Sequence, residues 1–245
     1  MSTTGAGDPW THTITAATTR PWVTLWPEWN MAREKLTDAK LDKLVISGKT
    51  RDTLRVVASW QSIGAAYKTA AETGATPLET SNRFLHYDGA GALKIEGAAE
   101  ATVDDWTLTI DNHGVVIGGD SLTPNDILDG ELTVDLVINR ITPSAALRNR
   151  LYYGGASPTD ATAVVQAILE LAGAPAGIDF LFTRVAASRS LELKVPRVAV
   201  QSFDPSLSVN PSDYLKDAIP LTALLPTGGV SPITAVALSG RATVF

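Results

Sequence analysis

The 245-residue sequence contains no cysteine, only three histidines, and few aromatic residues. Without cysteine the chain forms no disulfide and offers no thiolate to a metal ion or to nucleophilic catalysis. Lysine and arginine together number 20, against 26 aspartate and glutamate residues, so the formal net charge is -6. A protein that grips a phosphate backbone needs clustered cations, and this charge balance argues against such a role.

Signatures of membrane spanning and of catalysis are also missing. No stretch of about 18 apolar residues occurs, so the sequence predicts no membrane-spanning helix. There is no Gly-x-Ser-x-Gly elbow and no phosphate-cradling glycine loop between a strand and a helix. The histidines lie on separate segments, and the acidic stretch Asp120–Asp129 lacks the ligand spacing of an EF-hand loop. We therefore expect no catalytic site, no metal site and no cofactor.

Two segments between Val103 and Ile141 carry the clearest pattern in the chain. In each, apolar and mostly polar residues alternate with the period of two that is typical of a strand with one buried face. We expect these segments to pair in opposite directions and the rest of the chain to add further sheet around them. The glycine- and aspartate-rich excursion between them opens with Asp-Asn-His-Gly, a turn sequence in which asparagine and glycine tolerate positive φ. The apolar positions are Trp106, Leu108, Ile110, Leu132, Val134, Leu136 and Ile138.

The segment Pro21–Trp29 holds three of the six tryptophans. Its two prolines lack ladder donors, so the segment is predicted to be an edge strand. The tryptophans are explained either by core packing or by a surface that binds a partner, and the pattern leaves both interpretations open. Met31–Lys40, with five charged residues, is expected to form an exposed turn or a single helical turn.

One helix is predicted, over residues 158–172. Ser157 suits the N-cap, Pro158 the first helical position, and Gly173 the position after the last turn. An apolar stripe at i, i+3 and i+4 would pack this helix on a sheet. Farther along, the apolar parity of the strand from Leu191 flips at Pro196, which indicates a bulge or a sharp bend.

Several of these segments, taken together, resemble the major tail tube proteins of long-tailed (siphovirus-type) bacteriophages. The segments are WTLTIDNHG (106–114) with its following Gly/Asp/Pro loop, GELTVDLVI (130–138), THTIT (11–15) and LELKVPRVAVQSF (191–203). The resemblance covers most of residues 11–204. The sequence departs from the family pattern in two ways. Many relatives have a segment upstream of the point where this sequence starts, and the proline-rich stretch after Asp204 has no counterpart in the family. We expect a flexible arm at 1–9, the tail-tube β domain at 10–204, and an extension at 205–245 that ends in a strand.

The resemblance implies a mainly β subunit: an antiparallel β-sandwich or partial barrel with one flanking α-helix. It also implies that subunits form rings, of six copies in this family, through a continuous inner β-barrel. Stacked rings would make the virion's tail tube, assembled in the host cytoplasm, and DNA would pass through it without specific binding. The implied partners are other copies of the chain and the tail tip, tape-measure and terminator proteins.

Under this resemblance the polar faces of the central strands line the channel, and loops and exposed aromatic residues make contacts between rings or subunits. The expected channel-facing residues are Arg55, Ser59, Gln61, Thr107, Thr109, Asp111, Thr133, Asp135 and Asn139. The expected contact residues are Trp22, Trp26, Trp29, Lys68, Glu72, Glu79 and Arg83.

The residues alone leave other functions open. One alternative is a β-sandwich binding module for a carbohydrate or a receptor on a virion or cell surface, with the tryptophans of Pro21–Trp29 as its platform. Another is a related assembly, such as a tail terminator, a contractile-tail tube or a secretion-system tube.

Overall fold

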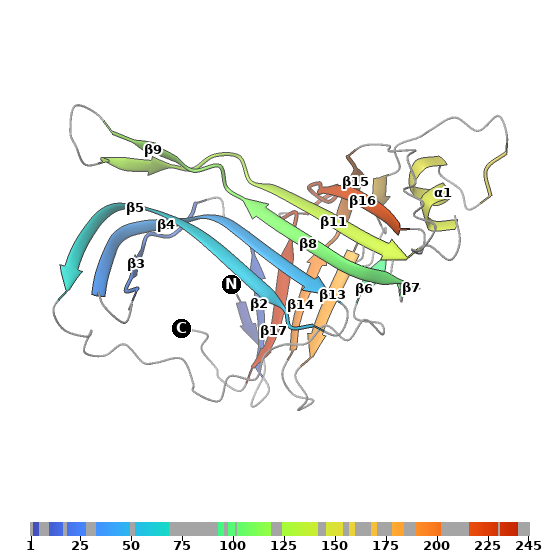
Figure 1. The fold of residues 1–245 in the computed structure, drawn as a ribbon, viewed down its shortest axis with the longest axis horizontal. Coiled ribbons are helices and arrows are strands. Elements are labelled where there is room, and N and C mark those ends of the chain that lie inside the picture. The colour runs from blue at the N-terminus through green and yellow to red at the C-terminus, as the bar shows by residue number, and fades with distance from the viewer. Residues whose placement is uncertain are drawn as a thin grey trace.

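The computed structural model describes residues 2–4, 10–16, 19–27, 33–49, 52–68, 93–95, 98–100, 102–118, 124–141, 146–153, 157–159, 168–170, 178–183, 190–201, 216–229 and 231–239. Two antiparallel sheets, a short two-stranded hairpin and one short helix make up the regular structure of this part of the chain (Figure 1). The predicted fold class, mainly β and of antiparallel sandwich type, is confirmed.

Sheet A has seven strands in the order β1-β2-β17-β14-β13-β6-β7. Part of the segment expected to be a flexible arm is its edge strand β1, in which Thr3 pairs with His12. The C-terminal strand β17 lies between β2 and β14, so residues beyond 205 contribute an interior strand of this sheet. The strands are β1 (Ser2–Thr4), β2 (Trp10–Thr15), β6 (Leu93–Ile95), β7 (Ala98–Ala99), β13 (Ile178–Thr183), β14 (Ser190–Val195) and β17 (Thr234–Ser239).

Sheet B has eight strands, seven of them in the order β12-β15-β16-β11-β8-β4-β3, with β5 paired to β4. The predicted antiparallel pair is β8 and β11, which occupies the middle of this sheet, with Thr107 opposite Val137. The strand β3 is an edge strand, as its prolines predicted. The strands are β3 (Val23–Leu25), β4 (Arg33–Lys49), β5 (Arg55–Lys68), β8 (Val103–Asp111), β11 (Thr133–Ile141), β12 (Ile168–Glu170), β15 (Arg197–Val200) and β16 (Lys216–Ala223).

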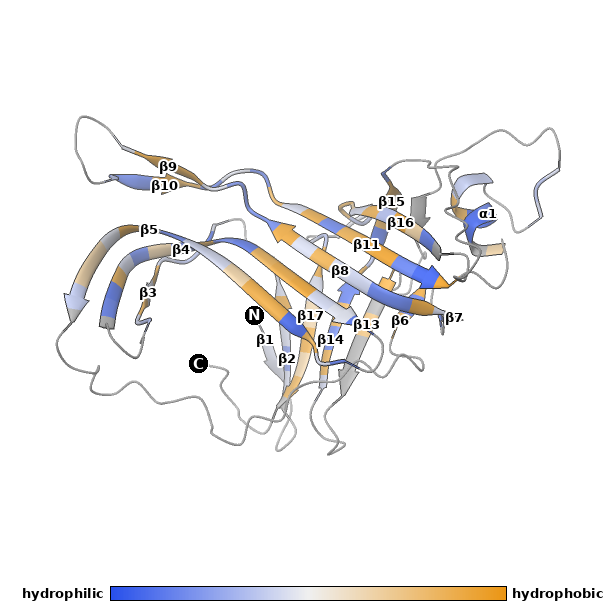
Figure 2. Ribbon diagram, in the orientation of Figure 1, coloured by the Kyte–Doolittle hydropathy of each residue, from blue (hydrophilic) through white to orange (hydrophobic). Residues whose placement is uncertain are grey.

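The core lies between the apolar faces of the two sheets. Trp106, Leu108, Leu136 and Ile138 of sheet B are buried, as the alternation predicted, and Figure 2 shows this alternation along β8 and β11. The ring of Trp106 lies 4.3 Å from that of Phe180 on β13, measured between centroids. This contact joins the two sheets at the centre of the core.

The chain passes from one sheet to the other at Pro196. The strand β14 before it belongs to sheet A, and β15 after it belongs to sheet B. Val195 on β14 and Val198 on β15 are both fully buried. The buried positions therefore change from odd-numbered to even-numbered residues at the point where the chain leaves one sheet for the other. Of the two predicted interpretations, the sharp bend is confirmed.

The helix predicted at 158–172 is wrong. Residues 157–159 are not helical, and Ile168–Glu170 is the edge strand β12, in which Leu169 pairs with Val198; residues 160–167 lie outside the described ranges. The helix of the described chain is α1 (Ala146–Tyr153), whose Leu151 and Tyr152 join the core. Sheet pairing at the open edge of β15 overrides the local helical pattern.

Two hairpins, one long and one short, extend away from the sandwich (Figure 1). The first consists of β4 and β5, and it begins within the charged segment that was expected to be a turn or a helical turn; that prediction is wrong from Arg33 onward. The second is formed by β9 (Val115–Ile117) and β10 (Asp126–Leu128), which interrupt the connection from β8 to β11. We call residues 115–117 and 126–128 the β9–β10 arm.

Candidate functional site

The face of sheet B that points away from the core is mostly polar. Cross-strand register places Ser47 of β4 opposite both Arg55 of β5 and Thr107 of β8, and Thr107 opposite Val137 of β11. Side chains directly opposite each other lie on one face of a sheet. We call this surface the polar face; its members on β8 and β11 are Asp105, Thr107, Thr109, Asp111, Thr133, Asp135, Val137 and Asn139.

The register brings together all the residues expected to face a channel. Gln61 differs from the others because the β9–β10 arm covers it: its side-chain Nε2 donates to the carbonyl oxygen of Gly114 over 3.0 Å, and the residue is half-buried. The open part of the polar face therefore holds the remaining predicted residues, which are Arg55, Ser59, Thr107, Thr109, Asp111, Thr133, Asp135 and Asn139.

Hydrogen bonds and ion pairs hold the carboxylates of the polar face. The side chain of Asp135 accepts from Gln201 over 2.6 Å and from Thr222 over 2.8 Å, and Asn139 donates to Asp105 over 2.5 Å. These contacts link Gln201, directly after β15, with β16, β11 and β8 across the sheet. The negative charges are thus fixed in place among hydrogen-bond donors.

The polar face also carries two lysine side chains that were not among the residues expected to face a channel. Lys43 and Lys49 of β4 lie opposite Asp111 and Asp105 of β8, and the ammonium of Lys43 is 3.2 Å from the carboxylate of Asp111. The face is therefore mixed in sign. Alternation around the inward-facing Leu44 and Ile46 would have identified these lysines once β4 was paired with β8.

Of the residues expected to make contacts, Trp22, Trp26 and Lys68 belong to the described chain, and Trp29, Glu72, Glu79 and Arg83 lie outside it. Trp22 and Trp26 are both exposed. The ammonium of Lys40 lies 4.3 Å from the centre of the Trp22 ring, so a cation–π contact holds that side chain on the protein surface. Neither tryptophan packs in the core, which removes one of the two interpretations left open for them.

The residues that lead into the β9–β10 arm are hydrogen-bonded to a bulge in β4. The extra residue of the bulge is Asp42, whose carbonyl oxygen accepts from the backbone of Asn112 over 2.8 Å and whose carboxylate accepts from the backbone of Gly114 over 2.9 Å. His113 between them has φ of 47°. The Asp-Asn-His-Gly segment ends β8, but the left-handed conformation expected at asparagine or glycine falls on the histidine, a residue for which positive φ is uncommon.

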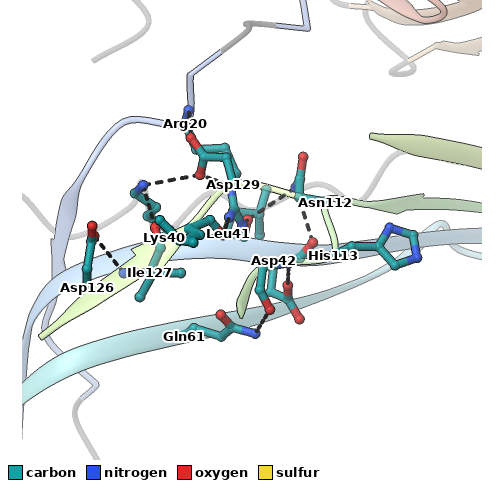
Figure 3. Close-up of polar contacts among 12 residues, drawn as sticks. Arg20, Lys40, Leu41, Asp42, Gln61, Asn112, His113, Asp126, Ile127 and Asp129 are labelled. Atoms are coloured by element: carbon teal, nitrogen blue, oxygen red, sulfur yellow. Dashed lines mark hydrogen bonds and ion pairs between the residues drawn. The ribbon is translucent and has the colours of Figure 1, made fainter. Parts of the chain in front are cut away.

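Three charged residues clasp the base of the arm, where the chain leaves β10 for β11 (Figure 3). Arg20 donates from Nε to the carboxylate of Asp129 over 2.7 Å, and its other nitrogens donate to the carbonyl oxygens of Leu41 and Leu128. Lys40 donates to the same carboxylate over 3.1 Å and to the carbonyl oxygen of Ile127 over 2.8 Å. We call Arg20, Lys40 and Asp129 the Asp129 clasp. Acidic and basic residues that form no sequence motif thus fix the arm to β4.

Two carboxyl groups near the base of the arm have lowered pKa values. Burial alone would raise the pKa of Asp129, but the hydrogen bonds from Arg20 and Lys40 outweigh it and lower that pKa below 3.8. The backbone N–H of His113 is the largest cause that lowers the pKa of Asp111, and Lys43 adds to it. Both groups are therefore held as carboxylates in the folded protein.

Replacing Asp129 by Asn is expected to destabilise the fold at neutral pH, by about 1–3 kcal/mol for hydrogen bonds to charged groups. A lowered pKa stabilises the folded state above the unfolded value of 3.8, and this contribution is lost as the pH falls through the folded-state value. The difference between wild type and Asp129→Asn should thus be constant near neutrality and shrink below pH 3.8. Urea titrations from pH 7 to pH 3 measure it.

Asp126→Asn, three residues earlier on β10, is the matched control. Its carboxylate accepts from the backbone N–H of Ile127 over 2.7 Å, a bond that an asparagine oxygen preserves. This variant should match the wild type at each pH. An Asp129→Asn difference that persists unchanged at pH 3 would contradict the assigned role of the clasp.

The described residues contain no cluster of three or more His, Asp or Glu side chains that could hold a metal ion. Within the same residues, no helix has the length and apolar character needed to cross a membrane. His12 is fully buried in sheet A, with Nδ1 3.0 Å from the hydroxyl of Thr3.

Residues 2–223 match the family model described as phage tail tube protein. The chain belongs to the phage tail tube protein family. No individual curated protein matches it. The family match includes the arm and every strand from β1 to β16, and β16 lies within the proline-rich stretch that had no counterpart in the resemblance. This tail tube protein thus has a structural role in the tail of a phage virion.

Proposed function

We propose that this tail tube protein assembles into rings of six copies, which stack into a hollow tube whose channel is lined by the polar face of sheet B. The observation that carries the proposal is the division of one continuous sheet into two surfaces. One surface packs against sheet A, and the other holds fixed polar and charged groups across β15, β16, β11, β8, β4 and β5. A water-filled channel requires a wall of this kind.

The charges of the polar face suit a channel through which DNA moves. Tight binding to DNA releases counterions from phosphates that lysine and arginine neutralise. Here Lys43 and Lys49 lie opposite Asp111 and Asp105, so their charges are offset by neighbouring carboxylates. DNA would meet polar groups and water with little net cationic attraction, and ejection into the host would not be slowed by adhesion.

The edges of sheet B favour assembly over a solitary monomer. Among the described strands, β5 pairs only with β4, and β12 pairs only with β15. Open edges template association with other chains, and a closed ring would remove them. We include Trp22, Trp26 and Lys68 among the groups that contact neighbouring copies. The tail tip, tape-measure and terminator proteins would be further partners after assembly in the host cytoplasm.

Negative-stain electron microscopy of the purified protein over a range of concentrations tests this function. We expect rings or hollow tubes with a central channel, formed more readily when a tail-tip nucleator is added. Compact monomers under every condition would overturn the proposal, and would favour a discrete binding module instead.

A further inference from the structure

The connection from the β9–β10 arm to β11 contains an Asp-Gly dipeptide, Asp129–Gly130, one of two in the sequence. An aspartate followed by glycine rearranges readily in flexible peptides, because glycine has no side chain to obstruct attack of its backbone nitrogen on the preceding carboxyl group. Asp129 is also the carboxylate of the clasp that fixes the arm. A covalent rearrangement here would therefore alter the element that positions the arm.

The rearrangement passes through a cyclic succinimide. The nitrogen of Gly130 forms a bond to Cγ of Asp129, and the amide proton and the carboxyl hydroxyl leave together as water. A second water molecule then opens the ring. Opening at Cγ restores aspartate, whereas opening at the main-chain carbonyl carbon leaves isoaspartate, in which the chain continues through the former side chain. The sequence of steps consumes no oxidant, reductant or other co-reactant.

The clasp opposes this reaction through the charge of Asp129. Ring closure needs the neutral carboxyl group, whose hydroxyl can leave as water. Burial raises the pKa of Asp129, but the hydrogen bonds from Arg20 and Lys40 outweigh it and lower that pKa. The folded protein therefore holds the group in its unreactive, ionised form.

The clasp also holds both oxygens of the carboxylate (Figure 3). Oδ1 accepts from Nε of Arg20 over 2.7 Å and from Nζ of Lys40 over 3.1 Å, and Oδ2 accepts from the backbone N–H of Arg20 over 3.4 Å. The reaction removes one of these oxygens as water, so it has to break contacts of the clasp. The side chain of Asp129 is 26% exposed, so exclusion of water is not what protects it.

The attacking nitrogen is restrained as well. The N–H of Gly130 donates to the carbonyl oxygen of Asn112 over 3.1 Å, and attack would remove this proton and break that bond. The Cα of Gly130 is packed so closely against the turn that a Cβ there would lie 2.2 Å from the carbonyl oxygen of His113. Rotation of the backbone at Gly130 is therefore restricted while the arm is in place.

We propose that Asp129–Gly130 is a latent isomerisation site that the Asp129 clasp holds inactive. Isoaspartate would insert one more carbon into the main chain beside Gly130, where the packing against His113 leaves no room for it. The modified chain could not close the clasp again, so the change would be irreversible for the arm. A virion cannot replace a damaged subunit, which gives this protection a purpose in a tail protein. The inference concerns a single copy and does not depend on assembly into rings.

The first test compares folded and urea-unfolded wild-type protein, incubated at pH 7 in water enriched in heavy oxygen. Each passage through the succinimide places one solvent oxygen in residue 129, so the mass of the peptide that contains it measures the reaction. Breaking a hydrogen bond to a charged group limits the reactive population by about tenfold or more. Labelling in the folded protein should be slower by at least that factor. Equal rates would overturn the proposal.

The second test compares Lys40→Met with Lys49→Met. Both lysines lie on β4, but only Lys40 contacts Asp129, and Lys49 is exposed. Labelling at Asp129 should be about tenfold faster in Lys40→Met than in the wild type, and unchanged in Lys49→Met. Circular dichroism checks that both variants are folded.

The other Asp-Gly dipeptide, Asp88–Gly89, lies outside the described residues and serves as an internal reference. Its labelling should be the same in Lys40→Met and Lys49→Met. Equal labelling of Asp129 in the two variants would show that the clasp does not protect it. An equal rise at both dipeptides in Lys40→Met would show a general loosening of the fold, and would likewise overturn the part assigned to the clasp. Neither result would bear on the proposed function.

Discussion

Trp106→Ala is expected to lower the free energy of unfolding by about 3–5 kcal/mol, the usual cost of removing a large buried aromatic side chain. Trp106 is almost wholly buried and makes the ring contact with Phe180 that joins sheet B to sheet A. A cavity at this point would open between two sheets, each of which is fixed by its own hydrogen bonds. The surrounding structure can therefore relax only partly to fill it.

The neighbour of Trp106 increases this expected cost. Gly48 pairs with Trp106 across the sheet, and a Cβ at Gly48 would lie only 2.7 Å from the indole ring. The indole thus covers a residue that has no side chain to fill the space after truncation. Domains of this kind have about 5–15 kcal/mol of total stability, so the expected loss is a large fraction of it.

Urea titration of the protein below its assembly concentration measures the Trp106→Ala effect. Trp26→Ala removes the same side chain from an exposed site and should change the free energy of unfolding by about 0.5 kcal/mol or less. Equal losses for the two variants would contradict the placement of Trp106 at the centre of the core.

Gly130→Ala should have the second-largest effect, at the point where the arm rejoins β11. A Cβ at Gly130 would lie 2.2 Å from the carbonyl oxygen of His113 and 2.8 Å from that of Asn112. Both are backbone atoms, and the N–H of Gly130 donates to the latter over 3.1 Å. The turn must therefore shift, at a cost of about 1–3 kcal/mol for overpacking.

The consequence of Gly130→Ala should concentrate in the arm. Hydrogen exchange should increase at Ile127 and neighbouring amides. Gly118→Ala is the control within the same connection, because a Cβ there would meet only one heavy atom, at 4.0 Å. If both variants behave like the wild type, the close approach at Gly130 does not hold the arm.

The central strands were predictable because apolar and polar residues alternate along them as buried and exposed positions alternate. Residues of β8 and β11 face either the core or the polar face, so a period of two identifies both the strands and the two surfaces. The bend at Pro196 was predictable for the same reason. The buried positions shift by one residue there because the chain leaves sheet A and enters sheet B, whose core-facing side points the opposite way.

The helical prediction failed because Ser157, Pro158 and Gly173 satisfy local rules for helix ends, whereas Ile168–Glu170 pairs with β15 far along the chain. Local sequence carries no information about a distant partner strand. The same limit applies to β16, which pairs with β11 and β15 far along the chain; the strand expected at the end of the C-terminal region is β17. Conversely, α1 has a weak amphipathic pattern and gave no signal of its own.

Much of the candidate site followed from the sequence, and the rest depended on tertiary pairing. The predicted channel-facing residues share a face because they occupy equivalent positions in paired strands. The Asp129 clasp joins Arg20, Lys40 and Asp129, which lie far apart in the sequence, so neither it nor the arm it anchors was predictable. Lys43 and Lys49 were missed because the pairing of β4 with β8 was not known.

Electron cryomicroscopy of assembled tubes, at a resolution that separates strands, tests the central claim most directly. The account predicts that Thr109 and Asp135 on the polar face of sheet B border the central channel, with Trp106 on the side away from it. A tube whose channel is lined by another surface, with the polar face of β8 and β11 on the outside or buried between subunits, would contradict it.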